Sequence, residues 1–299
     1  MAKECLHLLL LGMAVKGYYN AHMSFEGLKQ GFGDLKEHVL EMFENRFFAL
    51  AATYVERHKG EKDPYSRAIK EFVDDYFDAL NIHPQFIAES RPGFKEMREH
   101  LHSDAGIVLL NHPNEYLDIP AVATALATRD DVKIMVKQQL VGRLTNAFGR
   151  QFIVPSYKGG RELVGARDEV VEHIKGGGVF LIFPSGQVTS KFRFEGFVKQ
   201  LLKSKEIRDT DMVYSFYINQ EDADACLPDL RDRLVGMSPG LLLGSKIQSP
   251  SIHEPRTVRV DEHYGQVGQY RALVADLRGD EANEALVKHY SDQFGLEQK

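Results

Sequence analysis

The first hundred residues carry apolar side chains at helical spacing. Within residues 65–80, apolar positions recur at intervals of three and four residues, as on one face of a helix. They are Ile69, Phe72, Val73, Tyr76, Phe77 and Leu80. Asp63 and Pro64 supply an N-cap and a first-turn proline for this helix.

A second apolar stripe precedes this helix. It runs from Leu35 to Tyr54, and Gly60 can end the helix that carries it. No convincing strand interrupts the helical pattern in this region. The pattern therefore predicts a small helical bundle over residues 1–102.

From residue 103 the pattern changes to short apolar runs that alternate with helical periodicity. We expect strands at residues 106–110, 132–137, 151–154, 178–183, 212–218 and 256–260. We expect helices near residues 118–127, 138–147, 160–175, 195–204 and 267–295. Such alternation is typical of an α/β domain. Residues 103–299 are therefore predicted to form a three-layer α/β/α domain, with a central mixed sheet covered by helices on both faces.

Composition narrows the class of protein. The net charge of −6 argues against nucleic-acid binding. The two cysteines, Cys5 and Cys226, are too few for a disulfide framework and lack metal-ligand spacing, which favours a reducing cytoplasm and no metal. The apolar run at residues 8–15 is too short to cross a bilayer. We expect it to pack into the bundle, with peripheral contact to a membrane surface as the alternative.

Polar residues directly follow the predicted strand at 106–110, in the sequence "NHPNEYLD" (residues 111–118). A histidine at the end of a strand can take a proton from a hydroxyl near neutral pH, so His112 is a candidate general base. Asp118 or Glu115 could hold its other ring nitrogen. No serine elbow of the G-x-S-x-G type accompanies this segment, which favours a nucleophile supplied by the substrate. A capping turn would explain the same residues equally well.

The same segment resembles the first signature block of the glycerolipid acyltransferases. "IMVKQQL" (134–140), "FGRQFIVPSYKGGRE" (148–162), "GGGVFLIFPSGQVTSK" (176–191) and "MVYSFYIN" (212–219) resemble the later elements of that family in the same order. The resemblance covers about residues 104–220. Ser185 replaces the usual glutamate, and a helical segment comes first. Both features are similar to the soluble chloroplast-type glycerol-3-phosphate acyltransferases.

The resemblance implies transfer of a fatty acyl group from acyl-CoA or acyl carrier protein to a hydroxyl of glycerol-3-phosphate, without a cofactor. His112 would be the general base, with Asp118 favoured over Glu115 as its partner. Gln187 and Val188 stand where arginines usually follow Pro-Ser-Gly, so Lys191 and Arg193 would substitute. The expected substrate contacts are Asn111, Glu115, Lys137, Lys158, Arg161, Ser185, Gly186, Lys191 and Arg193. The alternatives are a lysophospholipid acceptor, thioester hydrolysis, or a non-catalytic protein that binds acyl lipids.

Overall fold

The structure is a computed structural model, and its described part is discontinuous. It describes residues 51–62, 64–87, 94–113, 129–136, 138, 141–142, 145, 152–153, 161–186, 193–226 and 255–296. By its internal contacts the chain divides into Met1–Asn45 and Arg46–Lys299. All described residues belong to the second unit, and the boundary predicted near residue 102 lies inside it.

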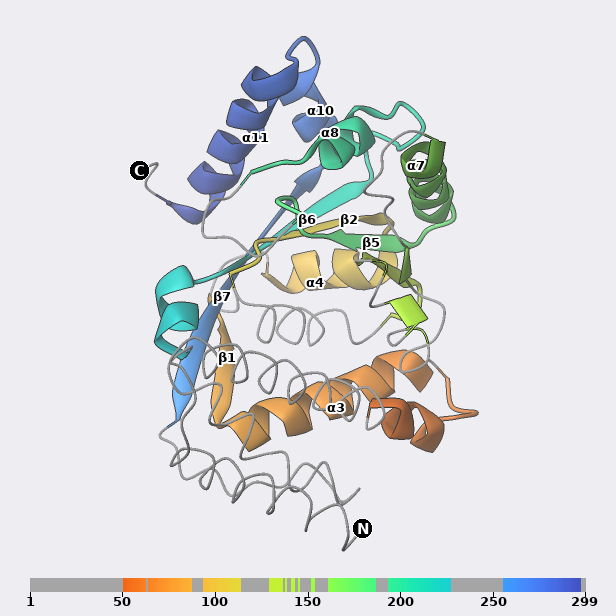
Figure 1. Cartoon of the computed structure of the whole chain (residues 1–299), viewed down its shortest axis with the longest axis vertical. Helices are drawn as coiled ribbons and strands as arrows, with labels where there is room; N and C mark the ends of the chain where they lie inside the picture. The colour runs from red at the N-terminus through yellow and green to blue at the C-terminus, as the bar shows by residue number, and fades with distance from the viewer. Residues whose placement is uncertain are drawn as a thin grey trace, which may run out of the picture. The chain divides into compact units, whose positions relative to one another are not determined.

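The second unit is built on a seven-stranded sheet with the strand order β1-β7-β6-β2-β5-β3-β4 (Figure 1). The strands are β1 Ile82–Phe86, β2 Gly106–Leu110, β3 Val132–Met135, β4 Phe152–Ile153, β5 Val179–Ile182, β6 Met212–Ile218 and β7 Arg256–Gln266. Strands β4, β3, β5, β2 and β6 run parallel to one another. Strand β7 is antiparallel to β6, and β1 is parallel to β7. The sheet is mixed, as predicted.

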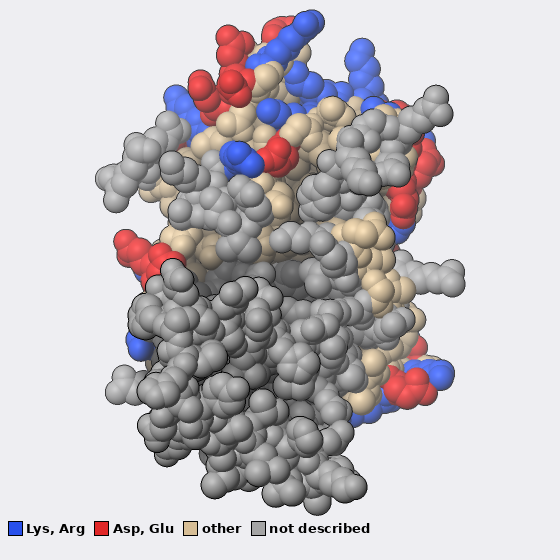
Figure 2. Space-filling model, in the orientation of Figure 1, with Lys and Arg blue, Asp and Glu red and all other residues tan. Residues whose placement is uncertain are grey.

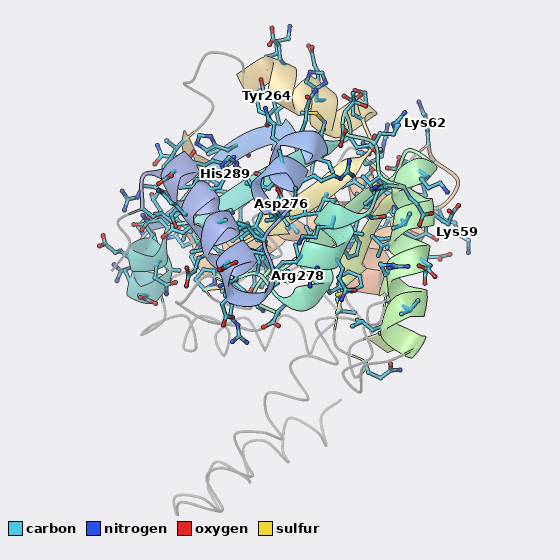
Figure 3. All side chains as sticks on the ribbon, turned by 90° about the horizontal axis from the view of Figure 1, so that it is seen from above. Lys59, Lys62, Tyr264, Asp276, Arg278 and His289 are labelled. Carbon is cyan, nitrogen blue, oxygen red and sulfur yellow. The ribbon has the colours of Figure 1, made fainter. Side chains whose placement is uncertain are left out.

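Helices cover both faces of this sheet. They are α3 Pro64–Leu80, α4 Phe94–Ser103, α7 Arg161–Lys175, α8 Gly196–Lys203, α10 Val267–Val274 and α11 Gly279–Phe294. Helices α7, α8, α10 and α11 lie on one side of the sheet and α4 on the other, which confirms the three-layer α/β/α prediction (Figure 1). In the view from above, α10 and α11 lie nearest the reader, with His289 on α11 (Figure 3).

Burial on both faces explains why the central strands are continuous apolar runs. Every residue of β2 and of β5 is buried. Ile107, Leu109 and Phe180 pack into one cluster with apolar side chains of α7, α8, α10 and α11. Burial of each such side chain contributes roughly 1.5–3 kcal/mol. This packing holds the strand ends at fixed positions.

Two predictions for the regular elements need correction. Residues 82–86, predicted to lie in an all-helical region, form strand β1, which pairs with β7. This strand is short, contains Pro84 and fully buries only Ile82, so it lacks an apolar run; its place at the sheet edge tolerates the proline. The single helix predicted at 267–295 is two helices, because residues 275–278, with Asp276 and Arg278 (Figure 3), separate α10 from α11.

The described part of the predicted bundle matches its pattern. Helix α3 begins at Pro64 and ends at Leu80, with Phe72, Tyr76 and Leu80 buried. The preceding helix continues to residue 57, and Gly60 follows it with a φ of 90°. Residues before 51, Asp63 and the helix predicted near 118–127 lie outside the described residues.

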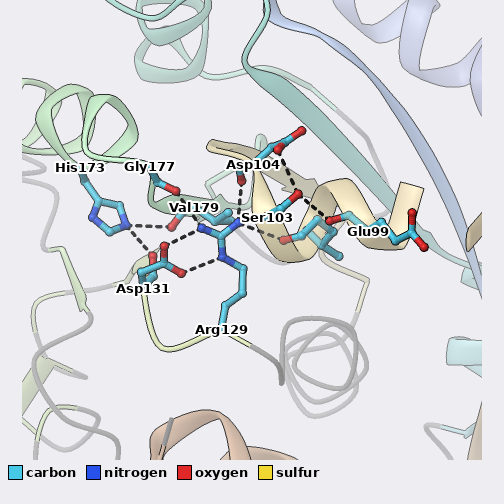
Figure 4. A network of polar contacts seen from close by, with 9 residues as sticks. Glu99, Ser103, Asp104, Arg129, Asp131, His173, Gly177 and Val179 are labelled. Atoms are coloured by element: carbon cyan, nitrogen blue, oxygen red, sulfur yellow. Dashed lines mark hydrogen bonds and ion pairs between the residues drawn. The ribbon is translucent and has the colours of Figure 1, made fainter. Parts of the chain in front are cut away.

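Arg129 joins the carboxyl end of α4 to the segments that precede β3 and β5 (Figure 4). Its side chain, 6% exposed, forms a bidentate ion pair with Asp131, with N–O distances of 2.7 and 2.5 Å. It also donates to the carbonyl oxygens of Leu101, Asp104 and Gly177, at 3.1, 2.6 and 2.8 Å. Burial acts to raise the pKa of Asp131, but the hydrogen bonds and charge of Arg129 outweigh burial and lower that pKa. One guanidinium thus ties α4 to β3 and to the turn before β5.

The turn before β5 begins at three consecutive glycines, residues 176–178. Helix α7 ends at Lys175, and Gly177 has a φ of 98°, which glycine adopts without strain. The Nε2–H of His173 donates to the carbonyl oxygens of Asp131 and Val179, at 2.8 and 3.1 Å. Because both partners are acceptors, this nitrogen carries the proton.

Acidification is expected to reduce the free energy of unfolding through two half-buried histidines. Burial lowers the pKa of His173 and of His289. A lowered folded-state pKa contributes stability above the unfolded pKa of about 6.5, and this stability is lost as pH falls through the folded pKa. Urea unfolding at about pH 7.5 and about pH 5.5 should show this loss, and His173→Gln should reduce it. Substitution of the exposed His83 by Gln is the control. An unchanged pH dependence in His173→Gln would contradict the assignment.

Candidate active site

His112 lies just beyond the carboxyl end of β2. The parallel register aligns Leu109 with Ile182 of β5 and Leu110 with Phe216 of β6, so these strands end at one edge of the sheet. We call this edge the carboxyl edge. Asn111 is buried, whereas His112 is partly exposed. A reagent in solution can therefore approach the imidazole, as a general base requires.

The side chain of Asn111 continues the strand pairing beyond β2. Its amide nitrogen donates to the Ile218 carbonyl oxygen at 2.8 Å, and its amide oxygen accepts from the Ile218 N–H at 2.7 Å. The amide thus replaces a backbone peptide as the partner of β6. This lets the main chain leave the sheet at residue 111 without losing those hydrogen bonds. The observed contacts give Asn111 a structural task, and its predicted substrate contact stays a prediction.

The ring of His112 stacks on Phe183, the residue that follows β5. The ring centroids are 4.1 Å apart, and the ring planes are 23° from parallel. Phe183 is 9% exposed, so this contact supports the imidazole from the sheet side. The two predicted signature blocks, Asn-His and Phe-Pro-Ser-Gly, therefore meet at the carboxyl edge.

A tight turn follows Phe183. The Gly186 N–H donates to the Phe183 carbonyl oxygen at 2.9 Å, and Gly186 has a φ of 65°. Side chains rarely adopt this backbone conformation, so the turn requires glycine at this position. Ser185 is 2% exposed and points away from solvent. The turn that begins at Phe183 thus lies beside the imidazole of His112.

Arg193 is held near this turn by Glu195. Their side chains form an ion pair at 2.7 Å, and both are about half exposed. The Glu195 N–H donates to the Pro184 carbonyl oxygen at 2.8 Å, and a side chain at Gly186 would contact Glu195. An exposed ion pair contributes little to stability. Arg193 can therefore exchange Glu195 for an anionic ligand at small cost.

Comparison with known proteins identifies this part of the chain. Residues 94–206 match the family model described as Acyltransferase. The chain carries an acyltransferase domain. The matched range includes β2, the Asn-His segment, β5 and the Pro-Ser-Gly turn. The predicted acyltransferase resemblance is confirmed, and the nearer likeness to chloroplast-type enzymes stays a prediction.

A comparison with solved structures covers more of the chain than the family model does. The fold is similar to the crystal structure of the 1-acyl-sn-glycerophosphate (LPA) acyltransferase PlsC from Thermotoga maritima. The TM-score is 0.45 and the sequence identity 15%, over 84% of this chain and 91% of that chain. No curated protein matches the sequence.

Several predicted site residues of the acyltransferase domain lie outside the described residues. They are Glu115, Asp118, Lys137, Lys158 and Lys191. Arg161 is the first residue of α7, and its side chain is also outside the description. The structure thus brings together Asn111, His112, Ser185, Gly186 and Arg193. The acidic partner of His112 stays a prediction.

Two side chains at the candidate site are not predicted from the sequence. Phe183 stacks on His112, and its place directly after a buried strand is the signal that could have found it. Tyr290 of α11 donates to the Phe216 carbonyl oxygen at the carboxyl edge. Its separation of 74 residues from Phe216 leaves no local signal in the sequence.

The described surface of the second unit, Arg46–Lys299, carries both basic and acidic side chains. Figure 2 shows basic and acidic side chains interspersed over the helices at the top of the molecule. Within the described ranges, no helix combines the length and the hydropathy that a membrane span needs.

Proposed function

We propose that this protein transfers a fatty acyl group from an acyl thioester to the primary hydroxyl of glycerol-3-phosphate, in the synthesis of phospholipids. The observation that carries the proposal is a partly exposed His112, stacked on Phe183 beside the Pro-Ser-Gly turn in a domain of the acyltransferase family. The proposal assigns Ser185 to ligand contact and not to nucleophilic attack. The alcohol of the acceptor is therefore the nucleophile in the proposal.

The proposed reaction needs one proton carrier. His112 removes the proton from the hydroxyl as its oxygen attacks the thioester carbonyl carbon. The tetrahedral intermediate then collapses, the C–S bond breaks, and the imidazolium returns the proton to the thiolate. Asp118, in preference to Glu115, stabilises the imidazolium in this proposal. The products are an ester and a free thiol.

The acceptor phosphate is assigned to the cations that follow β3, β4 and β5. Arg193 is the described member of this set, and its ion pair with Glu195 is exposed enough for a phosphate to compete. The other members are Lys137, Lys158, Arg161 and Lys191. A phosphate held by these groups would orient the neighbouring hydroxyl toward His112, and orientation of this kind contributes strongly to rate. Ser185 and Gly186 are assigned to the same ligand.

The proposal includes the setting of the reaction. The donor is acyl-CoA or acyl carrier protein, and the acceptor is a glycerophosphate. We place the protein in the cytoplasm, in peripheral contact with a membrane surface into which the lipid product passes. No cofactor takes part in the proposed chemistry, because acyl transfer between a thioester and an alcohol involves no change of oxidation state.

Product analysis with a labelled acyl donor tests the proposal. The purified protein is expected to form a labelled ester with glycerol-3-phosphate, from acyl-CoA or from acyl carrier protein. Faster esterification of lysophosphatidate would replace the acceptor in the proposal. Release of free fatty acid at a rate independent of acceptor would indicate thioester hydrolysis. Acyl-chain binding without any product would indicate a non-catalytic binding protein, and the enzyme proposal would then be wrong.

A further inference from the structure

The hydroxyl of Tyr290 lies where β2 and β6 separate. Tyr290 is on α11 and is fully buried. Its hydroxyl donates to the Phe216 carbonyl oxygen, and the Asn111 backbone hydrogen-bonds to the same hydroxyl. The Tyr290 ring contacts Phe194 and Phe294, with centroid distances of 6.4 and 4.7 Å. The side chain therefore has a fixed position against the carboxyl edge.

The backbone hydrogen bond at this point is long. The Asn111 N–H reaches the Phe216 carbonyl oxygen at 3.5 Å, compared with the usual value of about 2.9–3.0 Å. The Tyr290 hydroxyl gives both the Asn111 N–H and the Phe216 carbonyl oxygen a second hydrogen-bond partner, which compensates for this long bond. One residue further along β6, the side chain of Asn111 binds both backbone groups of Ile218. Asn111 is thus held on its main chain by α11 and β6, and on its side chain by β6.

We infer that Tyr290 is a positioning residue, which acts through Asn111 to hold His112 in its stacked position on Phe183. His112 is the next residue in the chain, so a change in the Asn111 main chain moves the imidazole directly. The catalytic consequence rests on the proposed role of His112 as general base. The geometric consequence does not depend on that role.

Helix α11 also holds the other side of the site. The Asn283 side-chain oxygen accepts a hydrogen bond from the Phe194 N–H at 2.7 Å. Phe194 lies between Arg193 and Glu195, the ion pair near the Pro-Ser-Gly turn. One helix thus contacts the segment that carries the candidate base and the segment that carries a candidate phosphate ligand.

Tyr270 provides a matched control. It is also fully buried, and it lies on the neighbouring helix α10. Its hydroxyl is 3.1 Å from the Ser215 hydroxyl oxygen and contacts the side chain of Gln293. Its hydrogen bonds therefore reach β6 without touching Asn111. Tyr270→Phe and Tyr290→Phe each remove one buried hydroxyl, and both should reduce stability to a similar extent.

The first test reads the position of His112 by NMR. The ring C–H signals of His112, identified by their loss in His112→Gln, carry a ring-current shift from the stacked Phe183. We expect Tyr290→Phe to change this shift and Tyr270→Phe to leave it unchanged. Equal His112 signals in wild type and Tyr290→Phe would overturn the inference, as would equal changes in the two variants. This measurement needs no enzymatic activity.

The second test reads acyl transfer in the same variants. Tyr290→Phe is expected to reduce kcat about tenfold or more, with KM for the acceptor unchanged, because small displacements of a catalytic group are costly. Tyr270→Phe should retain the wild-type kcat. A shifted His112 signal with no transfer in wild type would overturn the proposed function and leave the positioning role intact. A wild-type kcat in Tyr290→Phe would contradict the catalytic consequence.

Discussion

Substitution of His112 by alanine is expected to reduce kcat for acyl transfer by roughly 10²- to 10⁴-fold, the usual contribution of a general base. The residual rate would come from orientation of the bound substrates. The fold should persist, because His112 is partly exposed and its ring contact with Phe183 lies at the edge of the core. Steady-state kinetics with the acceptor identified by product analysis provides the measurement.

A histidine of the same domain provides the control for this substitution. His100 is exposed on α4 and pairs with Asp104 at 2.7 Å, so His100→Ala removes a surface contact alone. Its kcat should stay within about twofold of wild type, since exposed ion pairs contribute little. Wild-type activity in His112→Ala would remove the general base from the mechanism.

Variants of the two candidate acids belong to the same experiment. Asp118→Ala is expected to lose activity to an extent that approaches that of His112→Ala, because the acid stabilises the imidazolium formed during the reaction. Glu115→Ala should lose less. The reverse order would show that Glu115 is the partner.

Arg129→Ala is expected to lower the free energy of unfolding by about 1–3 kcal/mol, the usual cost of leaving buried hydrogen-bonding groups without their partner. The substitution removes the partner of Asp131 and leaves the carbonyl oxygens of Leu101, Asp104 and Gly177 without their donor. Buried acceptors without a donor are costly. Urea unfolding at neutral pH measures this loss.

Two variants separate the geometry of Arg129 from its charge. Arg129→Lys keeps the charge but cannot reach all of these acceptors, so an intermediate loss is expected. Arg167→Ala removes an exposed arginine that pairs with its neighbour Asp168, and it should cost less than about 1 kcal/mol. A loss in Arg129→Ala no larger than that in Arg167→Ala would show that the buried network does not stabilise the fold.

Prediction from the sequence succeeded where burial is uniform. Strands β2 and β6 have the predicted bounds of 106–110 and 212–218, because strands covered on both faces are nearly continuous apolar runs. Strand β1 was missed because this edge strand contains Pro84 and fully buries only Ile82. The break between α10 and α11 was missed because residues 275–278 mix apolar and polar side chains that are compatible with a continuous helix. A local sequence pattern reflects how far each residue is buried, whereas strand β1 and the break between α10 and α11 depend on the segments that pack against them.

The residues of the candidate site were predictable from the sequence, whereas the contacts between them were not. His112, Ser185, Gly186 and Arg193 were predicted from motifs that follow strands, and the sheet places their segments at one edge because parallel strands share their direction. The bond between Asn111 and Ile218 joins residues 107 positions apart. The stacking of His112 on Phe183 likewise depends on the pairing of β2 with β5.

The sequence by itself determined the layered α/β class, the central strands and the chemical groups at their ends, because hydrophobic periodicity and residue type are local properties. Only the tertiary structure decided which groups meet. The register of β2 between β5 and β6 placed Phe183 under His112, and the packing of α11 brought the Tyr290 hydroxyl to Asn111. Such contacts arise from the packing of distant segments, whose free energy depends on shape complementarity across the core and leaves no periodic trace along the chain.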